Sequence, residues 1–496
     1  MIIPLLLAVP FFAAVTAILL PARLAAARRW LVPAAGLVHA ALTAWLWICP
    51  ASPSALFSPW LHPDHLGLLF LALTSGLFVP AGFYAVGDMR RYAALSQRQG
   101  ISERLYVAGL LFFLMTMTAV CLAQDMGLMW VAVEATTLAT APLIYFRKSP
   151  GALEATWKYL LICSVGIALA LLGTFILAVA ASNASSGLFT LRVRALAYLA
   201  PLMDPALVRA AFIFLLVGYG AKMGLAPMHT WLPDAHAESP SPVSALLSGT
   251  LLNGAFLAIL RGADIVQSAG LDAFSGQMLR LFGLVSMGIA GAFILGQRDF
   301  KRLLAYSSVE HMGILAFGAG IGGAGLWAAL FHAVNHTFAK GCLFMTAGNI
   351  MFRYHDKSTL TVKGVRRGMP INGALWLAGF LAICGLPPFG IFLSEFSIII
   401  ASFSSDRAVE GVLFLVFLAV VFIGMLTVVL GMLRGAPPPL AEGEKRESTW
   451  MALPGLVALT LVAILGFGVP GFLAAALSEA AVIIDNDFVF MPGIRP

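Results

Sequence analysis

Long apolar segments follow one another through almost the whole chain, and they constrain the fold more than any other feature of the sequence. A helix that crosses a bilayer needs about 20 mostly apolar residues. Segments of this kind lie near 2–20, 29–49, 66–86, 106–124, 126–146, 156–181, 207–229, 240–260, 281–296, 303–321, 325–351, 371–402, 410–433 and 451–472. A short apolar stretch, 473–485, either finishes the last helix or lies at the interface. The sequence predicts an all-α, polytopic membrane protein with about 14 transmembrane helices.

The composition agrees with a bilayer environment. Of the 496 residues, 60% are hydrophobic and 11% are charged, whereas a soluble domain usually has about 25% charged residues. The five cysteines lie singly within or beside apolar segments, and no CxxC pair, Cys/His cluster or nucleotide-binding glycine motif occurs. We therefore expect no redox cofactor in this chain, no autonomous active site, and no nucleic acid partner despite the net charge of +7.

The basic residues indicate an orientation. Most of the 30 Lys and Arg residues fall in loops after odd-numbered segments, among them Arg98, Lys301, Lys445 and Arg446. Cytoplasmic loops retain positive charge, so both termini are expected outside the cytoplasm. The first segment has no positive charge ahead of it, which favours an uncleaved helix over a signal peptide. Three lysines, Lys158, Lys222 and Lys340, fall inside predicted spans.

Two predicted helices contain a break. Helix seven includes Pro227, and helix twelve includes Pro387 and Pro388. Proline removes a backbone donor and clashes with the preceding turn, so both helices should unwind there. Paired broken helices point to internal repeats around an ion site, although a kink can also be ordinary packing. We expect helices one to three in 1–104, two inverted five-helix repeats in 105–262 and 277–435, and helix fourteen with the tail in 436–496.

Three ionisable residues lie well inside predicted helices: Glu134, Lys222 beside the first break, and Glu395 after the second. An ionisable side chain at the centre of a bilayer costs at least about 2.5–3.5 kcal/mol, so each needs a partner or a function. These residues predict an ion pathway. The alternative is that they only hold helices together.

Helix eleven carries His332, His336 and Lys340 at intervals of four residues. This spacing places them on one helix face, about 5.4 Å apart along the axis. Histidine exchanges protons near neutral pH because its unperturbed pKa is about 6.5, so the row suits proton transfer. Glu310 and His311 on helix ten add a carboxylate and an imidazole. We expect no metal here, because no carboxylate or thiol shares the face and Lys340 would repel a cation.

Four further residues are secondary candidates. Lys158 follows Glu154 by four residues, which fits either an ion pair near the interface or a group that modulates Glu134. Asp234, His236 and Glu238 follow helix seven, where we expect them on the outer side, as a solvated loop or an ion outlet.

Three long motifs resemble a known family. They are Lys222-Met-Gly-Leu-Ala-Pro-Met-His-Thr-Trp-Leu-Pro-Asp-Ala-His-Ala-Glu-Ser-Pro, Lys301-Arg-Leu-Leu-Ala-Tyr-Ser-Ser-Val-Glu-His-Met-Gly, and His332-Ala-Val-Asn-His-Thr-Phe-Ala-Lys340. They resemble the antiporter-like, proton-translocating subunits of respiratory complex I and its relatives, over roughly residues 105 to 435. Asn253, Glu310 and Gly385-Leu-Pro-Pro-Phe-Gly390 look most like hydrogenase-4 component F of the group 4 membrane-bound NiFe hydrogenases.

The resemblance implies a proton pathway through Glu134, Lys222, His311, His332, His336, Lys340 and Glu395. One position departs from the family pattern, because many members have a central lysine where this chain has Asn253. An asparagine cannot carry a proton, so the relay would run through the His336/Lys340 row. The hypothesis that follows is that Glu134 pairs with Lys222 at rest, and that loosening this pair sends a proton towards Glu395.

The resemblance also implies the surroundings of the chain. We expect a prokaryotic cytoplasmic (inner) membrane, a homologous antiporter-like subunit, a helix-rich anchor subunit and a peripheral hydrogenase or dehydrogenase arm. NiFe and iron–sulfur centres are expected only in the partner subunits. The alternatives are a subunit of a quinone-linked NADH dehydrogenase, a subunit of a Na⁺/H⁺ antiporter complex, and a structural membrane adaptor.

Overall fold

The computed structural model describes residues 2–49, 60–95, 100–185, 187, 189–439 and 447–485. Arg98, Lys445 and Arg446, which contributed to the predicted orientation, lie outside this part. Within the described ranges the chain forms helices and no strand. The α-helices of the first half are α1 (Ile2–Leu19), α2 (Ala25–Ile48), α3 (His65–Leu95), α4 (Gly100–Leu122), α5 (Met126–Ile144), α6 (Pro150–Ala184), α7 (Val193–Leu199), α8 (Pro205–Met223), α9 (Trp231–Glu238), α10 (Ser241–Leu246) and α11 (Leu252–Ser268).

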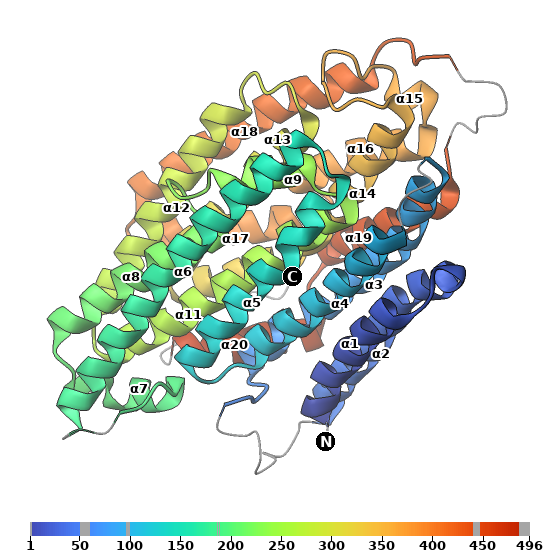
Figure 1. Ribbon diagram of the computed structural model, residues 1–496. Coiled ribbons are helices and arrows are strands. Elements are labelled where there is room, and N and C mark those ends of the chain that lie inside the picture. The colour runs from blue at the N-terminus through green and yellow to red at the C-terminus, as the bar shows by residue number, and fades with distance from the viewer. Residues whose placement is uncertain are drawn as a thin grey trace.

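The second half continues the same architecture. Its α-helices are α12 (Asp272–Ile294), α13 (Phe300–Ile321), α14 (Gly323–Tyr354), α15 (Val365–Gly368), α16 (Pro370–Ile383), α17 (Gly390–Ser404), α18 (Ala408–Leu433), α19 (Thr449–Phe467) and α20 (Gly471–Ile484). Short 3₁₀ turns lie at Ala22–Leu24, Tyr145–Arg147 and Ala200–Leu202. Figure 1 shows the long helices side by side along one common direction, with α7 at one end and α15 at the other.

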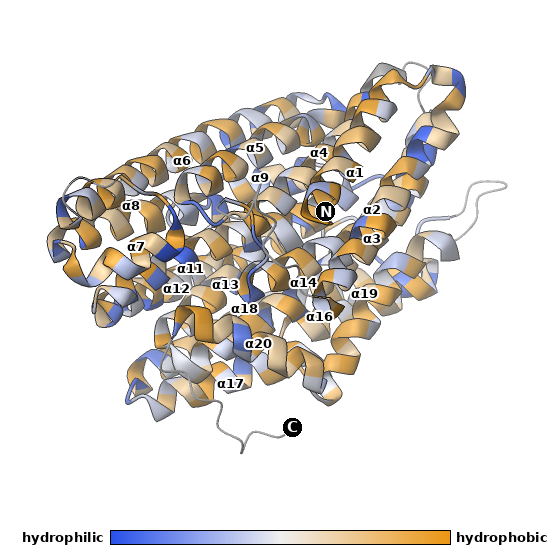
Figure 2. Cartoon of the chain, turned by 90° about the horizontal axis from the view of Figure 1, so that it is seen from below, coloured by the Kyte–Doolittle hydropathy of each residue, from blue (hydrophilic) through white to orange (hydrophobic). Residues whose placement is uncertain are grey.

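Most of the long helices have the length and composition of membrane spans. Among the described residues, 11 helices meet both criteria. The helices α13 and α14 are long enough to span a membrane, at 22 and 32 residues, but their polar residues lower their mean hydropathy. The helices α16 and α17 are each too short to span a membrane alone. Figure 2 shows hydrophobic residues along most of each helix and hydrophilic residues in shorter stretches. The all-helical membrane fold is confirmed, whereas the number of fourteen crossings stays a prediction.

The eighth predicted helix lies at the centre of the molecule. It consists of α10, a π-helical segment η4 (Leu247–Leu251) and α11, and its most apolar window is 100% buried. Gly249 lies within η4, and a Cβ atom there would meet the Thr337 backbone of α14 and the Leu77 side chain of α3. Glycine therefore allows the central helix and α14 to approach closely.

Both predicted helix breaks are present. The first separates α8 from α9: Gly224 ends α8 with φ of 85°, and the Trp231 indole donates to the Ala221 carbonyl at 2.8 Å. The second separates α16 from α17 and contains the cis Pro387–Pro388 bond and Gly385, whose φ is 63°. Backbone groups that a broken helix leaves unpaired need such partners inside a membrane.

The last predicted span is shorter than expected. The helix α19 ends at Phe467, and α20 begins at Gly471 as a separate helix of 14 residues. The helix α20 packs against α3, α11 and α14, so the apolar stretch after 472 is an independent packing element. The first helix, α1, packs against α2 and α4.

Candidate functional site

Lys222 lies in the last turn of α8, directly before the first helix break. Its side chain is buried. Its ammonium donates to the Thr137 hydroxyl at 2.8 Å and to the Tyr159 hydroxyl at 2.6 Å. The Nζ atom also lies 4.6 Å from the centre of the Tyr159 ring, at a distance where a cation–π interaction contributes. The buried lysine is therefore held by two hydroxyl groups and an aromatic face.

Glu134 lies on α5, three residues before Thr137. Its carboxylate accepts from Thr137 at 3.1 Å and from Ser164 of α6 at 2.8 Å. No direct ion pair joins Glu134 to Lys222 among the described residues; Thr137 bridges them. The hypothesis that Glu134 and Lys222 act as a pair at rest stays a prediction, and the contact between the two charges runs through Thr137, one helical turn from Glu134.

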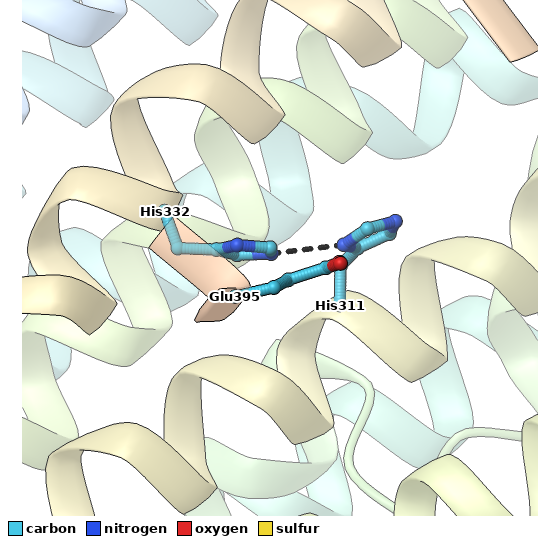
Figure 3. A group of neighbouring side chains, drawn as sticks. All are labelled: His311, His332 and Glu395. Atoms are coloured by element: carbon cyan, nitrogen blue, oxygen red, sulfur yellow. Dashed lines mark hydrogen bonds between the residues drawn. The ribbon is translucent and has the colours of Figure 1, made fainter. Parts of the chain in front are cut away.

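A second polar group lies where α13, α14 and α17 meet. His311 Nδ1 and His332 Nε2 are 2.9 Å apart in a hydrogen bond, and Glu395 from α17 completes the group (Figure 3). One possible ligand atom from each residue lies within 4.8 Å of the others. All three residues are buried. The expectation that no carboxylate shares the helix face of His332 and His336 considered one helix only, and the carboxylate of this group comes from the neighbouring helix α17.

The row on α14 continues from this group towards the other end of the helix. His332, His336 and Lys340 are all buried. The His336 ring centre is 5.2 Å from that of His311, and neither of its nitrogens has a hydrogen-bond partner. The Lys340 ammonium donates to the Leu304 carbonyl at 2.8 Å and the Ser307 hydroxyl at 2.6 Å. The row therefore faces α13 along its length.

Two further predicted residues lie in this region. Glu310 is buried on α13, close enough to Lys340 for an electrostatic interaction. Asn253 of α11 donates to the Gly249 carbonyl at 2.8 Å and to the Thr337 hydroxyl of α14 at 2.9 Å. Its Oδ1 atom is buried without a partner. Asn253 thus joins the central helix to α14 one residue from His336.

The acidic residues of α9 lie at an unexpected end of the molecule. Asp234 pairs with Arg302 at 2.6 Å and with Lys158 at 2.8 Å, and Glu238 pairs with Lys357 at 2.7 Å. We call the end where these groups meet the basic end. In the predicted topology the loop after helix seven lies on the cytoplasmic side, together with the basic loops. The expectation that these residues lie on the outer side was therefore inconsistent with that topology. Lys158 is exposed and also pairs with Glu154 at 2.7 Å, so the ion-pair interpretation describes it.

His236 and Lys301 lie deeper at the basic end. His236 is buried, stacks on Phe344 with ring centres 4.9 Å apart, and has no partner for either nitrogen. Lys301, which we expected in a loop, is buried in the first turn of α13 and donates to the Ser239 carbonyl at 2.6 Å. A cavity of about 480 Å³ opens at this end, lined by Asp88, Arg147, Glu238 and Lys357 among others.

Several polar groups were not singled out from the sequence. Thr137, Tyr159 and Ser394 bond directly to predicted residues, but hydroxyl residues are common in membrane helices and carry no distinctive pattern. Asp64 and Arg261 form a buried, two-fold ion pair at the end opposite the basic end, with N–O distances of 2.8 and 3.0 Å. His39 is buried with a hydroxyl on each nitrogen, from Ser75 and Thr118.

Comparison with known proteins identifies the family. Residues 123–427 match the family described as "NADH:quinone oxidoreductase/Mrp antiporter, TM". The chain belongs to this family. The matched segment contains both helix breaks and every ionisable residue of the two polar groups.

Individual relatives agree with this assignment. The chain is 40% identical over 348 residues to a hydrogenase-4 component F homolog from Methylacidiphilum infernorum, covering 69% of this chain and 72% of the relative. It resembles a subunit in the structure of the archaeal membrane-bound sulfane sulfur reductase, with a TM-score of 0.83, 20% identity and 97% of each chain covered. It also resembles a subunit of the Mrp complex from Dietzia sp. DQ12-45-1b, with a TM-score of 0.83, 21% identity, and 98% and 97% of the chains covered. These two likenesses establish the shared fold.

Proposed function

We propose that this chain is the proton-translocating membrane subunit of a redox-driven complex of the group 4 NiFe hydrogenase type. The observation that carries the proposal is the pair of buried, hydrogen-bonded polar groups, one around Lys222 and one around His332, inside a fold shared with antiporter-like subunits. The 40% identity to a hydrogenase-4 component F homolog supports the hydrogenase assignment. Burying a charged side chain in a membrane costs free energy, and the residues that carry such charges usually mark an ion pathway.

The contacts suggest the order of transfer. A proton enters through the cavity at the basic end and passes Lys301 and His236 towards Lys340 and His336. Lys222 supplies a second proton to the row on α14, and Glu134 and Thr137 adjust how firmly Lys222 holds it. Asn253 carries no proton, so it separates the Lys222 group from the row on α14 and transfer past it needs water. His311, His332 and Glu395 form the final group.

The same proposal covers the arrangement in the membrane. Fourteen crossings, two inverted five-helix repeats over 105–262 and 277–435, and termini outside the cytoplasm are consistent with the two helix breaks and the basic end. The partners are a homologous antiporter-like subunit, a helix-rich anchor and a peripheral arm. The arm carries the NiFe and iron–sulfur centres, and its redox energy reaches this chain as an electrostatic change along the membrane.

The test is proton uptake by the purified complex in vesicles, driven by its electron donor. We expect Glu134→Gln and Lys222→Met each to abolish uptake while the subunit still assembles. Lys158→Met is the matched control, because Lys158 is an exposed lysine in ion pairs outside the buried groups, and it should leave uptake close to normal. Normal uptake in both test variants would contradict the proposal.

A Na⁺/H⁺ antiporter-complex subunit is the second candidate, favoured by the likeness to the Mrp complex. Sodium flux against a pH gradient, without any electron donor, would identify it. A quinone-linked NADH dehydrogenase subunit is the remaining alternative, which the subunits that co-purify with the chain would reveal.

A further inference from the structure

We propose that His311, His332 and Glu395 bind a divalent transition-metal ion such as Zn²⁺, and that the bound ion blocks the pathway at this point. The three residues come from three different helices, α13, α14 and α17, and converge in the interior (Figure 3). Two imidazoles and one carboxylate are a ligand set that zinc takes up in proteins with one position left open. The inhibition, though not the binding, rests on the proposed function.

The spacing of the ligand atoms fits a metal after a small adjustment. His311 Nδ1 and His332 Nε2 are 2.9 Å apart, whereas two nitrogens bound to tetrahedral zinc at 2.0–2.1 Å are about 3.3 Å apart. The ring centres are 5.1 Å apart, so the two nitrogens face each other almost in line. The rings must therefore separate by about 0.4 Å and each turn by about 35° before both nitrogens point at one tetrahedral ion. The Ser394 hydroxyl donates to the Ile391 carbonyl, so it accepts from His332 Nδ1, and the proton between the two rings belongs to His311 Nδ1. Metal binding requires this proton to move to His311 Nε2 or to solvent, which frees both facing nitrogens as ligands.

The surroundings orient the ligands. His332 Nδ1 is hydrogen-bonded to the Ser394 hydroxyl at 2.9 Å, which leaves Nε2 to face the centre of the group. A ligating histidine usually has such an oxygen partner on its other nitrogen. Glu395 Oε1 is buried without a hydrogen-bond partner. Glu395 Oε2 packs against Gly385 so closely that a Cβ atom there would overlap it, so the helix break fixes the carboxylate.

The charges nearby permit a cation. The Lys340 ammonium points to Leu304 and Ser307 of α13, where its hydrogen bonds hold it two helical turns along α14 from His332. Glu310 lies within electrostatic reach of Glu395, so two carboxylates offset the charge of the ion. Our expectation that Lys340 would repel a metal ion was based on spacing along one helix. It did not take account of these two carboxylates, which come from other helices.

The direct experiment measures zinc bound to the purified complex after dialysis, together with its X-ray absorption spectrum. We expect one zinc per subunit in the wild type, with two imidazole ligands, that is lost in His332→Gln and Glu395→Gln. Ser394→Ala should keep the ligands but weaken binding about 10- to 100-fold, as loss of an orienting group does. His39→Gln is the control, since it removes another buried imidazole in α2 and should bind zinc like the wild type.

Two results would overturn the metal site: no difference in bound zinc between wild type and the ligand variants, or a spectrum without imidazole ligands. Proton uptake with and without Zn²⁺ is measured on the same samples. Zinc that binds as expected but leaves uptake unchanged would refute the block and the proposed pathway through this group, while the metal site itself would stand.

Discussion

Thr137→Val is the substitution that most directly tests how Glu134 acts on Lys222. Valine keeps the shape of threonine and removes the hydroxyl that accepts from Lys222 and donates to Glu134. A hydrogen bond to a charged group contributes about 1.5–3 kcal/mol. The substitution removes two such bonds. Since 1.4 kcal/mol is a factor of ten, the loss of either one alone would slow proton uptake about 10- to 100-fold, so we expect a loss of at least about 10-fold.

A double-mutant cycle isolates the coupling. If Glu134 acts through Thr137, then Glu134→Asp, which keeps the charge but withdraws it by one methylene, should slow uptake in the wild type and have little further effect once Thr137 is valine. The assay is proton uptake by reconstituted vesicles at a fixed rate of electron donation, with the amount of assembled subunit measured in each variant. Thr174→Val is the matched control, because Thr174 is a buried threonine whose hydroxyl bonds only to its own helix, at Ala170.

Two results would contradict the proposed role of the Thr137 bridge. Effects of Thr137→Val and Glu134→Asp that multiply would show that the two residues act independently. A Thr137→Val variant with the uptake of the Thr174→Val control would show that the bridge is irrelevant to transport.

Three further predictions concern stability and pH. Arg261→Met alone should lower the free energy of unfolding by about 3–5 kcal/mol because it leaves Asp64 buried without a partner, and adding Asp64→Leu should recover most of it, as measured by detergent titration. Gly385→Ala should destabilise the protein and abolish uptake, since its Cβ would overlap Glu395, whereas Gly270→Ala, at φ of 72° with nothing within 4 Å, should show only the backbone strain of about 1 kcal/mol. Hydrogen bonds from Thr361 and from the Ser358 amide lower the pKa of Asp356. The 356–361 loop should therefore be protected from hydrogen exchange above about pH 4 and lose this protection as the pH falls through the lowered pKa, whereas Asp356→Asn should remove the pH dependence.

The spans and the breaks could be predicted because they depend on local properties. Apolar length places a helix in a bilayer, and at both breaks a proline follows a glycine with positive φ, Gly224 or Gly385. Proline alone is not sufficient, since Pro33 and Pro80 lie inside continuous helices. Element ends were less predictable: α19 stops at Phe467 before Gly468, and α20 is a helix of its own. Lys301 shows a different limit, because a lysine near a predicted loop is buried only through the packing of α13 against α9 and its hydrogen bond to the Ser239 carbonyl.

The candidate site was predicted along each helix and missed between helices. The row of His332, His336 and Lys340 follows from spacing on α14, and it is present. The contact of His311 with His332 and Glu395 depends on how three helices meet, which no single helix pattern encodes. The bridge at Thr137 was missed for the same reason, since it depends on how α5 and α8 lie beside each other.

The position of Lys222 at the very end of α8 has one more consequence. The carbonyl groups at a helix C-terminus together carry about half a negative charge, and that charge belongs to the backbone. Lys222 lies in this last turn, so its positive charge lies at the end of the helix where the backbone stabilises a cation. Because the backbone charge is fixed, only side-chain contacts, such as the link through Thr137 to Glu134, can vary the stabilisation of the ammonium during transport.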